Sequence, residues 1–323
     1  MTLSSTHFTD GIIVFFKPQG MTSHDAVGFV RRLTGIRRVG HTGTLDPMAE
    51  GVLPICVGGA TRLIEFMDAG KPDAKAYECE MRLGVTTDTL DVWGETVSVA
   101  DGADFRDMAA PARVREIFAS LVGDIRQIPP AYSAIKYNGK KLYEYARGGE
   151  DIPKEALRPR DVHIDSMDVQ GVAMDEEGRD VATVGFATVR FSVVCSSGTY
   201  VRSIVRDVGE SLGCGAAMSA LTRTKSGTFT LSDAHTKEAL KRAADDDALP
   251  KLMLPPDAGV PFMPFIRLGE TACRKFVNGV AIRISADMEL PSGVPIRVYG
   301  EDSFIGVGIC VSGEIKPCKV IFA

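Results

Sequence analysis

The hydrophobic positions of this chain follow two different spacings, which indicates that strands and helices are mixed along it. Residues 11–17, GIIVFFK, form a continuous apolar run of strand length, closed by the turn sequence Pro18-Gln19-Gly20. Residues 77–83 alternate strictly between apolar and polar side chains, which is the pattern of a half-buried strand. Residues 181–197 predict two strands joined by a turn.

Apolar side chains three and four positions apart predict helices between these strands. The first helix begins at Ser23, which we expect to cap it, and ends at Gly35. Pro111 suits the first turn of a later helix. The predicted helices cover residues 23–34, 59–69, 111–122, 199–212 and 237–249.

The C-terminal part of the chain has a different pattern. A proline-rich linker occupies residues 254–264, and short apolar segments separated by glycine turns follow it. This arrangement predicts a separate β-module of about 60 residues. Its predicted strands cover residues 282–285, 296–299, 304–311 and 315–322.

The composition is that of an ordinary globular protein. Of 323 residues, 45% are hydrophobic and 24% charged, which excludes a disordered, collagenous or coiled-coil chain. An apolar run of about 18 residues, the length needed to span a bilayer, is absent. The first ten residues carry no Lys or Arg, unlike a secretory signal. We therefore expect a cytoplasmic protein with no membrane partner.

The net charge of −5 argues against a nucleic-acid partner, but the charge is unevenly distributed. Basic residues concentrate in residues 17–47 and 124–149, and acidic residues elsewhere. These two basic segments form one polyanion-binding face or are simply solvated, and composition leaves both readings open.

Neither a metal nor a cofactor is predicted. The seven cysteines contain no CxxC pair and the five histidines no HxxxH pair, so clustered metal ligands are missing. The Walker-A and GxGxxG patterns of nucleotide-binding proteins are also absent.

Two segments lack a purely structural pattern. Residues 128–149, IPPAYSAIKYNGKKLYEYARGG, are rich in Tyr and Lys with little apolar periodicity, so we expect an exposed projection. Residues 40–47, GHTGTLDP, place Asp46 before a proline in a glycine-rich turn next to a basic helix. An Asp-Pro pair alone is typical of an ordinary turn.

Five segments in this order carry a family resemblance: FFKPQGMTSHDAV, RRVGHTGTLDPMAEGVLPICVGGATRL, KAYECEMRLGVTTDTLDVWGE, QIPPAYSAIKYNGKKLYEYARGG and CSSGTYVRSIVRDVGESLGCGAAMSALTRTKSG. Together they closely resemble the bacterial TruB family of tRNA pseudouridine synthases. The resemblance runs from residue 11 to about residue 227 and resumes in the C-terminal module, which resembles the small RNA-binding barrel called PUA.

The resemblance implies an α+β fold, with a mixed, largely antiparallel sheet flanked by helices and a small β-barrel-like PUA module. It implies a catalytic domain over residues 1–250, with a thumb insertion at about 124–152, and a PUA-like RNA-binding domain over 260–323. The implied activity converts uridine 55 in the T-loop of tRNA to pseudouridine after the base is flipped out, without a cofactor.

The family's catalytic residues correspond to three positions. Asp46 matches the nucleophile, which attacks C1′ of the ribose or C6 of the base, and the sequence leaves that choice open. Tyr200 matches a tyrosine near C5, a candidate base for the C5 proton. Arg202 matches an arginine that pairs with the nucleophile and keeps it ionised.

Other matches concern substrate binding. Tyr77 corresponds to a tyrosine that stacks on the target base, and Leu221 to a leucine of the base pocket. His41 corresponds to a histidine that enters the T-loop when the uridine is extruded, and Lys17 to a residue that supports the active-site loop. The thumb residues expected to contact phosphates are Lys136, Lys140, Lys141 and Arg147.

Two departures from the family pattern are Thr44, where Ala is common, and Thr222, where Arg is common. The second predicts the loss of one phosphate contact. The T-arm stem-loop of tRNA is the expected partner, without guide RNA or an obligatory protein. Two alternatives are a non-catalytic tRNA-binding or tRNA-folding module and a guide-dependent synthase, and the long thumb argues against the second.

Overall fold

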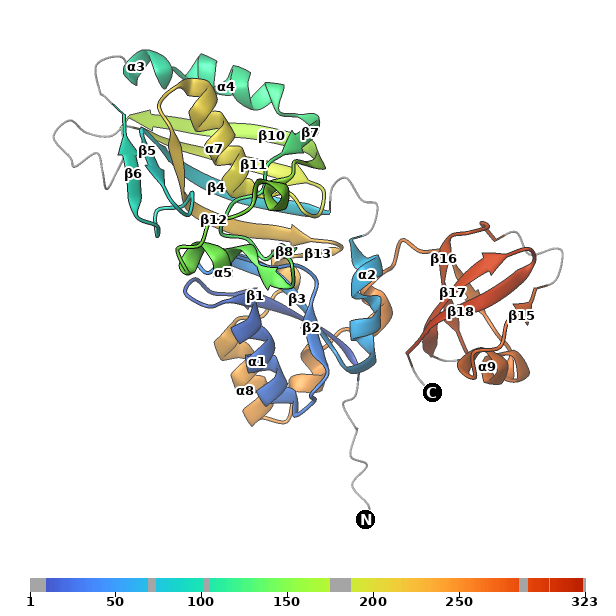
Figure 1. Ribbon diagram of the computed structural model, residues 1–323. Helices are drawn as coiled ribbons and strands as arrows, with labels where there is room; N and C mark the ends of the chain where they lie inside the picture. The colour runs from blue at the N-terminus through green and yellow to red at the C-terminus, as the bar shows by residue number, and fades with distance from the viewer. Residues whose placement is uncertain are drawn as a thin grey trace.

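The computed structural model describes residues 10–68, 74–100, 105–174, 187–284, 290–301 and 303–321. Its main body is a nine-stranded sheet in the order β1-β3-β12-β4-β11-β10-β7, with β2 paired to β3 and β13 to β12 (Figure 1). Only the β3–β12 pairing within these described strands is parallel. The strands are β1 (Gly11–Lys17), β2 (Val39–His41), β3 (Glu50–Val57), β4 (Lys75–Leu83), β7 (Gly123–Gln127), β10 (Arg160–Met174), β11 (Ala187–Cys195), β12 (Ala216–Ser226) and β13 (Phe229–Thr230).

Helices flank this sheet, so the predicted α+β class is confirmed. Figure 1 shows α4 (Pro111–Ser120) and α7 (Val201–Leu212) on one face, where they contact each other, β10 and β12. The helices α1 (Ser23–Thr34) and α8 (Lys237–Asp245) pack together against β1. Shorter helices are α2 (Ile64–Met67), α3 (Phe105–Met108) and α5 (Leu142–Arg147). Of the helices in the described segments, none is long and apolar enough to cross a membrane.

The prediction that Ser23 caps the first helix is wrong. Thr22 is the cap: its hydroxyl accepts from the Asp25 amide, while the Asp25 carboxylate accepts from the Thr22 amide. Gly35, with φ of 69°, ends the helix as expected. Because Thr22 takes the capping role, the buried Ser23 hydroxyl is available to the neighbouring loop.

The predicted helix over residues 59–69 is also wrong in kind. A 3₁₀-helix, η1 (Gly58–Leu63), precedes the single turn of α2, and Ala69 lies outside the described residues. Residues 181–197 were predicted to form two strands. Residues 181–186 lie outside the described part of the chain, and the described remainder contains the strand β11.

The C-terminal module is a curled five-stranded sheet in the order β14-β16-β17-β18-β15, which fits a PUA-like fold. Its strands are β14 (Phe265–Arg267), β15 (Ile282–Arg283), β16 (Pro295–Tyr299), β17 (Phe304–Val311) and β18 (Glu314–Val320), with helix α9 (Glu270–Val277) packed on β18 and β15. Of the residues in the predicted strands, Ser285 and Phe322 lie outside the described chain. The domain boundaries at 250 and 260 stay a prediction.

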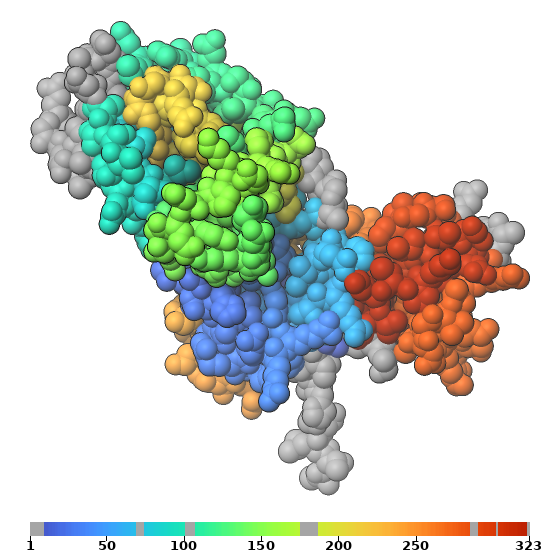
Figure 2. Space-filling model, in the orientation of Figure 1, coloured from blue at the N-terminus to red at the C-terminus, as the bar shows by residue number. Residues whose placement is uncertain are grey.

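The module packs directly on the main body. One cluster of buried apolar side chains contains Ile12 and Leu63 of the body together with Phe304, Val307 and Ile321 of the module. Lys319 pairs with Glu65 of α2 at 2.7 Å. Figure 2 shows the module, in orange and red, against the light-blue segment formed by η1 and α2.

Candidate active site

The loop between β2 and β3 carries Asp46, and buried groups fix its backbone. The Ser23 hydroxyl accepts from the Leu45 amide at 2.8 Å and donates to the Leu45 carbonyl at 3.0 Å. On the other side of Asp46, the Gly20 amide donates to the Pro47 carbonyl at 2.8 Å. The residues that flank Asp46 are therefore held at both sides.

Arg223 supports the same loop from β12, and we did not predict it. Its side chain is fully buried and donates to the carbonyls of Val52 (2.7 Å), Thr44 (3.4 Å) and Gly43 (3.2 Å). Gly51 allows the backbone of Arg223 to pack closely against β3, because a Cβ atom there would lie 2.3 Å from the Arg223 carbonyl oxygen. The pairing of β12 with β3 brings Arg223 to this loop, and the sequence alone does not reveal that pairing.

Asp46 is paired with Arg202, as the resemblance implies. The Arg202 Nε lies 2.8 Å from Asp46 Oδ2, at the first turn of α7. The rest of the guanidinium donates to the carbonyls of Thr89 (2.7 Å) and Tyr132 (2.8 Å). The Arg202 side chain is 4% exposed and that of Asp46 is 31% exposed. A buried cation that donates from each of its three nitrogens thus holds a carboxylate that solvent can reach.

Asp91 is a second residue that we did not predict. It follows β5 (Val85–Thr87), in the loop of the hairpin completed by β6 (Thr96–Val99), and its Oδ2 lies 3.9 Å from Arg202 Nη1. Its Oδ1 accepts from the Thr89 hydroxyl and the Trp93 amide, both at 3.0 Å. Burial raises the pKa of Asp91, and the nearby Arg202 cation opposes this effect. Arg202 therefore lies between two carboxylates.

Tyr200 is the residue immediately before α7 and is held by Gln127 of β7. The Gln127 side chain accepts from the Tyr200 amide at 2.8 Å and donates to the Tyr200 carbonyl at 3.1 Å. Burial raises the pKa of the Tyr200 hydroxyl, and the Asp46 carboxylate contributes in the same direction. At neutral pH this side chain is therefore a protonated phenol, a group that both donates and accepts hydrogen bonds.

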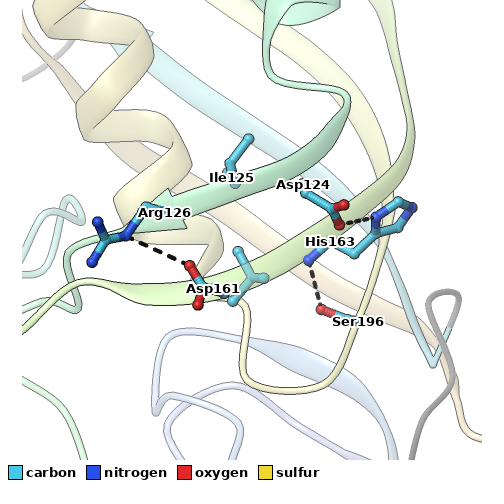
Figure 3. Close-up of a pocket in the computed structure, with 7 residues that line it drawn as sticks. Asp124, Ile125, Arg126, Asp161, His163 and Ser196 are labelled. Atoms are coloured by element: carbon cyan, nitrogen blue, oxygen red, sulfur yellow. Dashed lines mark hydrogen bonds and ion pairs between the residues drawn. The ribbon is translucent and has the colours of Figure 1, made fainter.

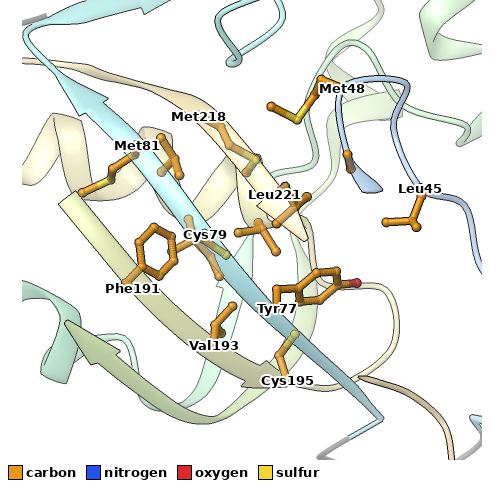
Figure 4. Packing of buried hydrophobic residues seen from close by; sticks show 14 of the residues in the cluster. Leu45, Met48, Tyr77, Cys79, Met81, Phe191, Val193, Cys195, Met218 and Leu221 are labelled. Atoms are coloured by element: carbon orange, nitrogen blue, oxygen red, sulfur yellow. The ribbon is translucent and has the colours of Figure 1, made fainter. Parts of the chain in front are cut away.

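Tyr77 and Leu221 lie on neighbouring strands, at the side of the apolar cluster that faces Leu45 (Figure 4). Register places Leu221 opposite Cys79 and Arg223 opposite Tyr77. Tyr77 is 8% exposed and Leu221 5%. Burial raises the pKa of the Tyr77 hydroxyl, against the effect of the Arg223 cation. The pair forms an apolar floor next to the loop of Asp46.

His41 and Lys17 lie at the two sides of that loop. The His41 Nδ1 accepts from the Gly43 amide at 3.2 Å, and burial together with the Arg223 cation lowers the pKa of His41, which keeps the ring neutral. Lys17 has no exposed surface, and its Nζ donates to the carbonyls of Met21 (2.7 Å) and Pro18 (3.0 Å). Burial lowers the pKa of Lys17 to about 8, and the Asp46 carboxylate opposes that change.

The predicted thumb residues lie apart from this buried centre. Strands β8 (Lys136–Tyr137) and β9 (Lys140–Lys141) form a hairpin that leads into α5, and Figure 2 shows this green segment on the surface beside the β5–β6 hairpin and the blue N-terminal part. Lys140 pairs with Glu150 at 2.5 Å and lies over the Tyr145 ring. Lys141 and Arg147 flank Tyr143 at 5.3 and 5.5 Å, and Lys136 is exposed.

The thumb is connected to the centre through Tyr132. Its carbonyl accepts from Arg202, and its hydroxyl donates to Asp88 Oδ2 at 3.0 Å. Thr222, at the departure from the family pattern, donates to Glu50 at 3.2 Å, while Thr44 contributes only its carbonyl to Arg223. The loop of Asp46, the β5–β6 hairpin and the thumb are therefore joined at Arg202.

A surface hollow of about 450 Å³ lies elsewhere, between β7, β10 and the turn after β11. Figure 3 shows Asp124 bonded to His163 and Arg126 paired with Asp161 there, and it contains none of the predicted site residues. Within the described segments, no group of three or more His, Cys, Asp or Glu side chains is placed to hold a metal ion.

Comparison with known proteins identifies the family of this chain. Residues 31–201 match the TruB family pseudouridylate synthase (N terminal domain), and residues 202–261 match the tRNA pseudouridylate synthase B C-terminal domain. Because the first match spans more than half of the chain, this protein belongs to the TruB family of pseudouridylate synthases.

Relatives with specific names are similar over nearly their whole length. The tRNA pseudouridine synthase B of Geobacillus thermodenitrificans is 40% identical over 314 residues, which are 96% of this chain and 99% of the relative. That of Ralstonia nicotianae is 39% identical over 316 residues, 96% of this chain and 94% of the relative.

Two solved structures have folds similar to that of this chain. A chain in the crystal structure of a Cbf5-Nop10-Gar1 complex aligns with a TM-score of 0.67 at 23% identity, covering 99% of this chain and 88% of the other. A chain in the structure of an H/ACA RNP bound to a substrate RNA containing 2′-deoxyuridine aligns with a TM-score of 0.67 at 21% identity. That alignment covers 100% of this chain and 88% of the other.

Proposed function

We propose that this protein isomerises uridine 55 in the T-loop of tRNA to pseudouridine, with Asp46 as the nucleophile. The coarser activity, conversion of uridine to pseudouridine in tRNA, follows from the family and its named relatives. The position of the uridine and the roles of single residues are the proposal. The observation that carries it is the Asp46–Arg202 pair at 2.8 Å, with the carboxylate open to solvent and the cation buried.

The reaction conserves every atom of the nucleotide. The N1–C1′ bond breaks, a C5–C1′ bond forms, and the C5 proton leaves while N1 gains one. A carboxylate that attacks C1′ or C6 supplies the covalent step, so neither a redox reagent nor a group donor is consumed. Arg202 keeps Asp46 oriented through the chemistry.

The neighbouring groups fit the remaining needs of such a reaction. Tyr77 and Leu221 supply an apolar floor for a flipped uracil, since a flat ring tolerates rotation of the base above it. Tyr200 immediately precedes α7, whose first turn carries Arg202, and its protonated phenol relays the C5 proton rather than acting as a preformed phenolate. His41 is neutral and planar, and fills the space that the extruded base leaves in the T-loop stack.

The partner in this proposal is the T-arm stem-loop, contacted by Lys136, Lys140, Lys141 and Arg147 of the thumb. The thumb lies at the surface next to the loop of Asp46 and shares Arg202 with it through Tyr132. We propose that the chain acts without a guide RNA or an obligatory protein, because its own thumb supplies the contacts that would clamp the substrate.

The test is pseudouridine mapping in tRNA incubated with the purified protein alone, comparing wild type with Asp46→Asn. Asparagine keeps the shape of the side chain but is no nucleophile, so turnover should fall by at least about 10³-fold. Affinity for tRNA should stay within about threefold, because the neutral amide keeps one hydrogen-bond acceptor for Arg202.

Asp161→Asn is the matched control, since that carboxylate is 90% exposed and pairs only with Arg126 among the described residues. Pseudouridine at another position would disprove the assignment to uridine 55. Wild-type protein that binds or refolds tRNA without forming pseudouridine would support the non-catalytic alternative.

A further inference from the structure

The segment that leads from β7 into the thumb is fastened to the start of α7 at two levels. Gln127 bonds both the amide and the carbonyl of Tyr200, the residue before the helix. Further along the segment, the Tyr132 carbonyl accepts from Arg202 Nη2 at 2.8 Å. Ser133 follows Tyr132 directly, so these contacts fix its position beside the N-terminal end of α7.

The Ser133 hydroxyl is a buried polar group that has no hydrogen-bond partner among the described residues. The residue is only 4% exposed. Its backbone, by contrast, is bonded on both sides: its amide donates to the Ala131 carbonyl at 3.0 Å, and its carbonyl accepts from the Tyr143 amide at 3.1 Å. Burial of a hydroxyl without a partner costs free energy of folding. The backbone therefore holds in place a side-chain donor that the fold itself does not use.

The Tyr200 hydroxyl is the group that this donor faces. Burial raises the pKa of that phenol, and the Asp46 carboxylate acts in the same direction. The cations of Arg160 and Arg202 lower the pKa, and so does Ser133, because its hydroxyl donates to the phenolate form. The Ser133 hydroxyl thus gains a partner when the Tyr200 oxygen carries negative charge.

We propose that Ser133 is a positioning residue for removal of the C5 proton and that it acts through Tyr200. In this step the C5–H bond breaks, and its electron pair restores the C5–C6 double bond of the ring. The proton forms an O–H bond with the Tyr200 oxygen, while the phenol's own proton passes to a water molecule. As that proton leaves, the Tyr200 oxygen carries partial negative charge, which the hydrogen bond from Ser133 stabilises.

This inference rests on the proposed function for the role of Tyr200, and it gives the thumb segment a part in the chemistry. The test compares Ser133→Ala with Ser203→Ala, a second buried serine at the same junction. Ser203 has no exposed surface, and its hydroxyl donates to the Ile128 carbonyl at 2.9 Å. Ser203→Ala should lower the free energy of unfolding measured with urea, because a bond is lost. Ser133→Ala removes a hydroxyl without a partner and should leave that free energy unchanged or raised.

The kinetic measurement is the single-turnover rate of pseudouridine formation in a T-arm hairpin with hydrogen or deuterium at C5 of the target uridine. Ser133→Ala should lower the rate by about tenfold or more, with unchanged affinity for the hairpin and an isotope effect at least as large as that of wild type. Ser133→Cys keeps a side chain of similar volume with only a weak donor, so it should behave like Ser133→Ala. A lower rate with a smaller isotope effect would place the loss in another step and overturn the proposal.

Tyr200→Phe tests whether Ser133 acts through the phenol. In this background, which lacks the phenol hydroxyl, Ser133→Ala should cause no further loss of rate. Additive losses overturn the proposal, as does a wild-type rate for Ser133→Ala alone. Failure of the proposed function is distinguishable, because wild-type protein would then form no pseudouridine in the hairpin.

Discussion

The catalytic loop and the thumb both face the substrate in our proposal, but they are built in opposite ways. The loop of Asp46 is fixed by buried groups from three different elements: Ser23 of α1, Arg223 of β12 and Arg202 of α7. The thumb has two-residue strands, one short helix and cations that lie over its own tyrosines. Chemistry requires a preorganised charge, whereas binding of an RNA backbone tolerates side chains that adapt. The following predictions test that contrast, from the largest expected effect to the smallest.

Among the changes that test this contrast, replacing Arg202 with Lys should have the largest effect. Lysine keeps the charge but cannot bond Asp46, Thr89 and Tyr132 together, so kcat should fall by about 10²-fold with little change in KM. Single-turnover rates on a T-arm hairpin measure this. Arg206→Lys, one turn further along α7, is the control. If both variants lose activity equally, fixed geometry at Arg202 is not what the chemistry needs.

Lys17 should make stability depend on pH. Its pKa is about 8 in the folded protein and 10.5 when exposed, so between these values the unfolded chain binds the proton and the folded chain does not. Stability from this group therefore rises with pH in that window. The free energy of unfolding of wild type, measured with urea, should rise by on the order of 2 kcal/mol relative to that of Lys17→Met between pH 7.5 and pH 10. A constant difference would show that Lys17 is hydrated.

His41 tests whether the rim of the loop acts in base extrusion. His41→Ala should lower the rate at which a structured T-arm hairpin is modified by about tenfold. The variant no longer compensates the stacking loss of a few kcal/mol that accompanies base extrusion. A hairpin with a disrupted loop stack should be affected less. Tyr200→Phe should slow both hairpins alike, because proton removal follows extrusion. Single-turnover rates of both variants on both hairpins are the measurement. If His41→Ala lowers the rate equally on the two hairpins, a role of His41 in base flipping is excluded.

The thumb should give the smallest effects, and they should depend on salt. Lys136→Ala should lower the slope of log affinity against log salt by about 0.7–0.9 for one lost phosphate contact. Lys140→Ala should lower it less, because Glu150 already neutralises that amine. Lys251→Ala, an exposed change in the 3₁₀ turn after α8, serves as control. Three identical slopes would show that the thumb lysines are only solvated.

The sequence allowed the local elements to be predicted, because their signals are local. Strands β1 and β4 and helices α1, α4 and α7 show their periodicity within a few residues. Strand β10 escaped prediction since its register shifts near Asp165 and Gln170 break the alternation. Strand β12, AAMSALTRTKS, has small and polar residues that become a strand only between β3 and β4.

The site divides in the same way. Asp46, Tyr200 and Arg202 were identified from motifs that match a family, and the structure brings Asp46 and Arg202 into contact. Arg223, Asp91 and Gln127 were missed, because nothing near them in the sequence indicates their partners. Arg223 bonds residues 171 to 180 positions away, and Gln127 a residue 73 positions away. A fully buried arginine is the one signal that would have directed attention to Arg223, and burial requires the strand pairing.

The parallel pairing of β3 with β12 has a consequence for the timing of synthesis. Asp46 leaves the ribosome long before Arg202 and Arg223, which follow it by 156 and about 180 residues. At 5–20 residues per second the delay is roughly 8–35 s. During that time the nascent chain already contains Asp46 but has neither its paired cation, Arg202, nor the strand that fixes the loop. The arrangement that we propose for catalysis is therefore complete only when β12 has entered the sheet.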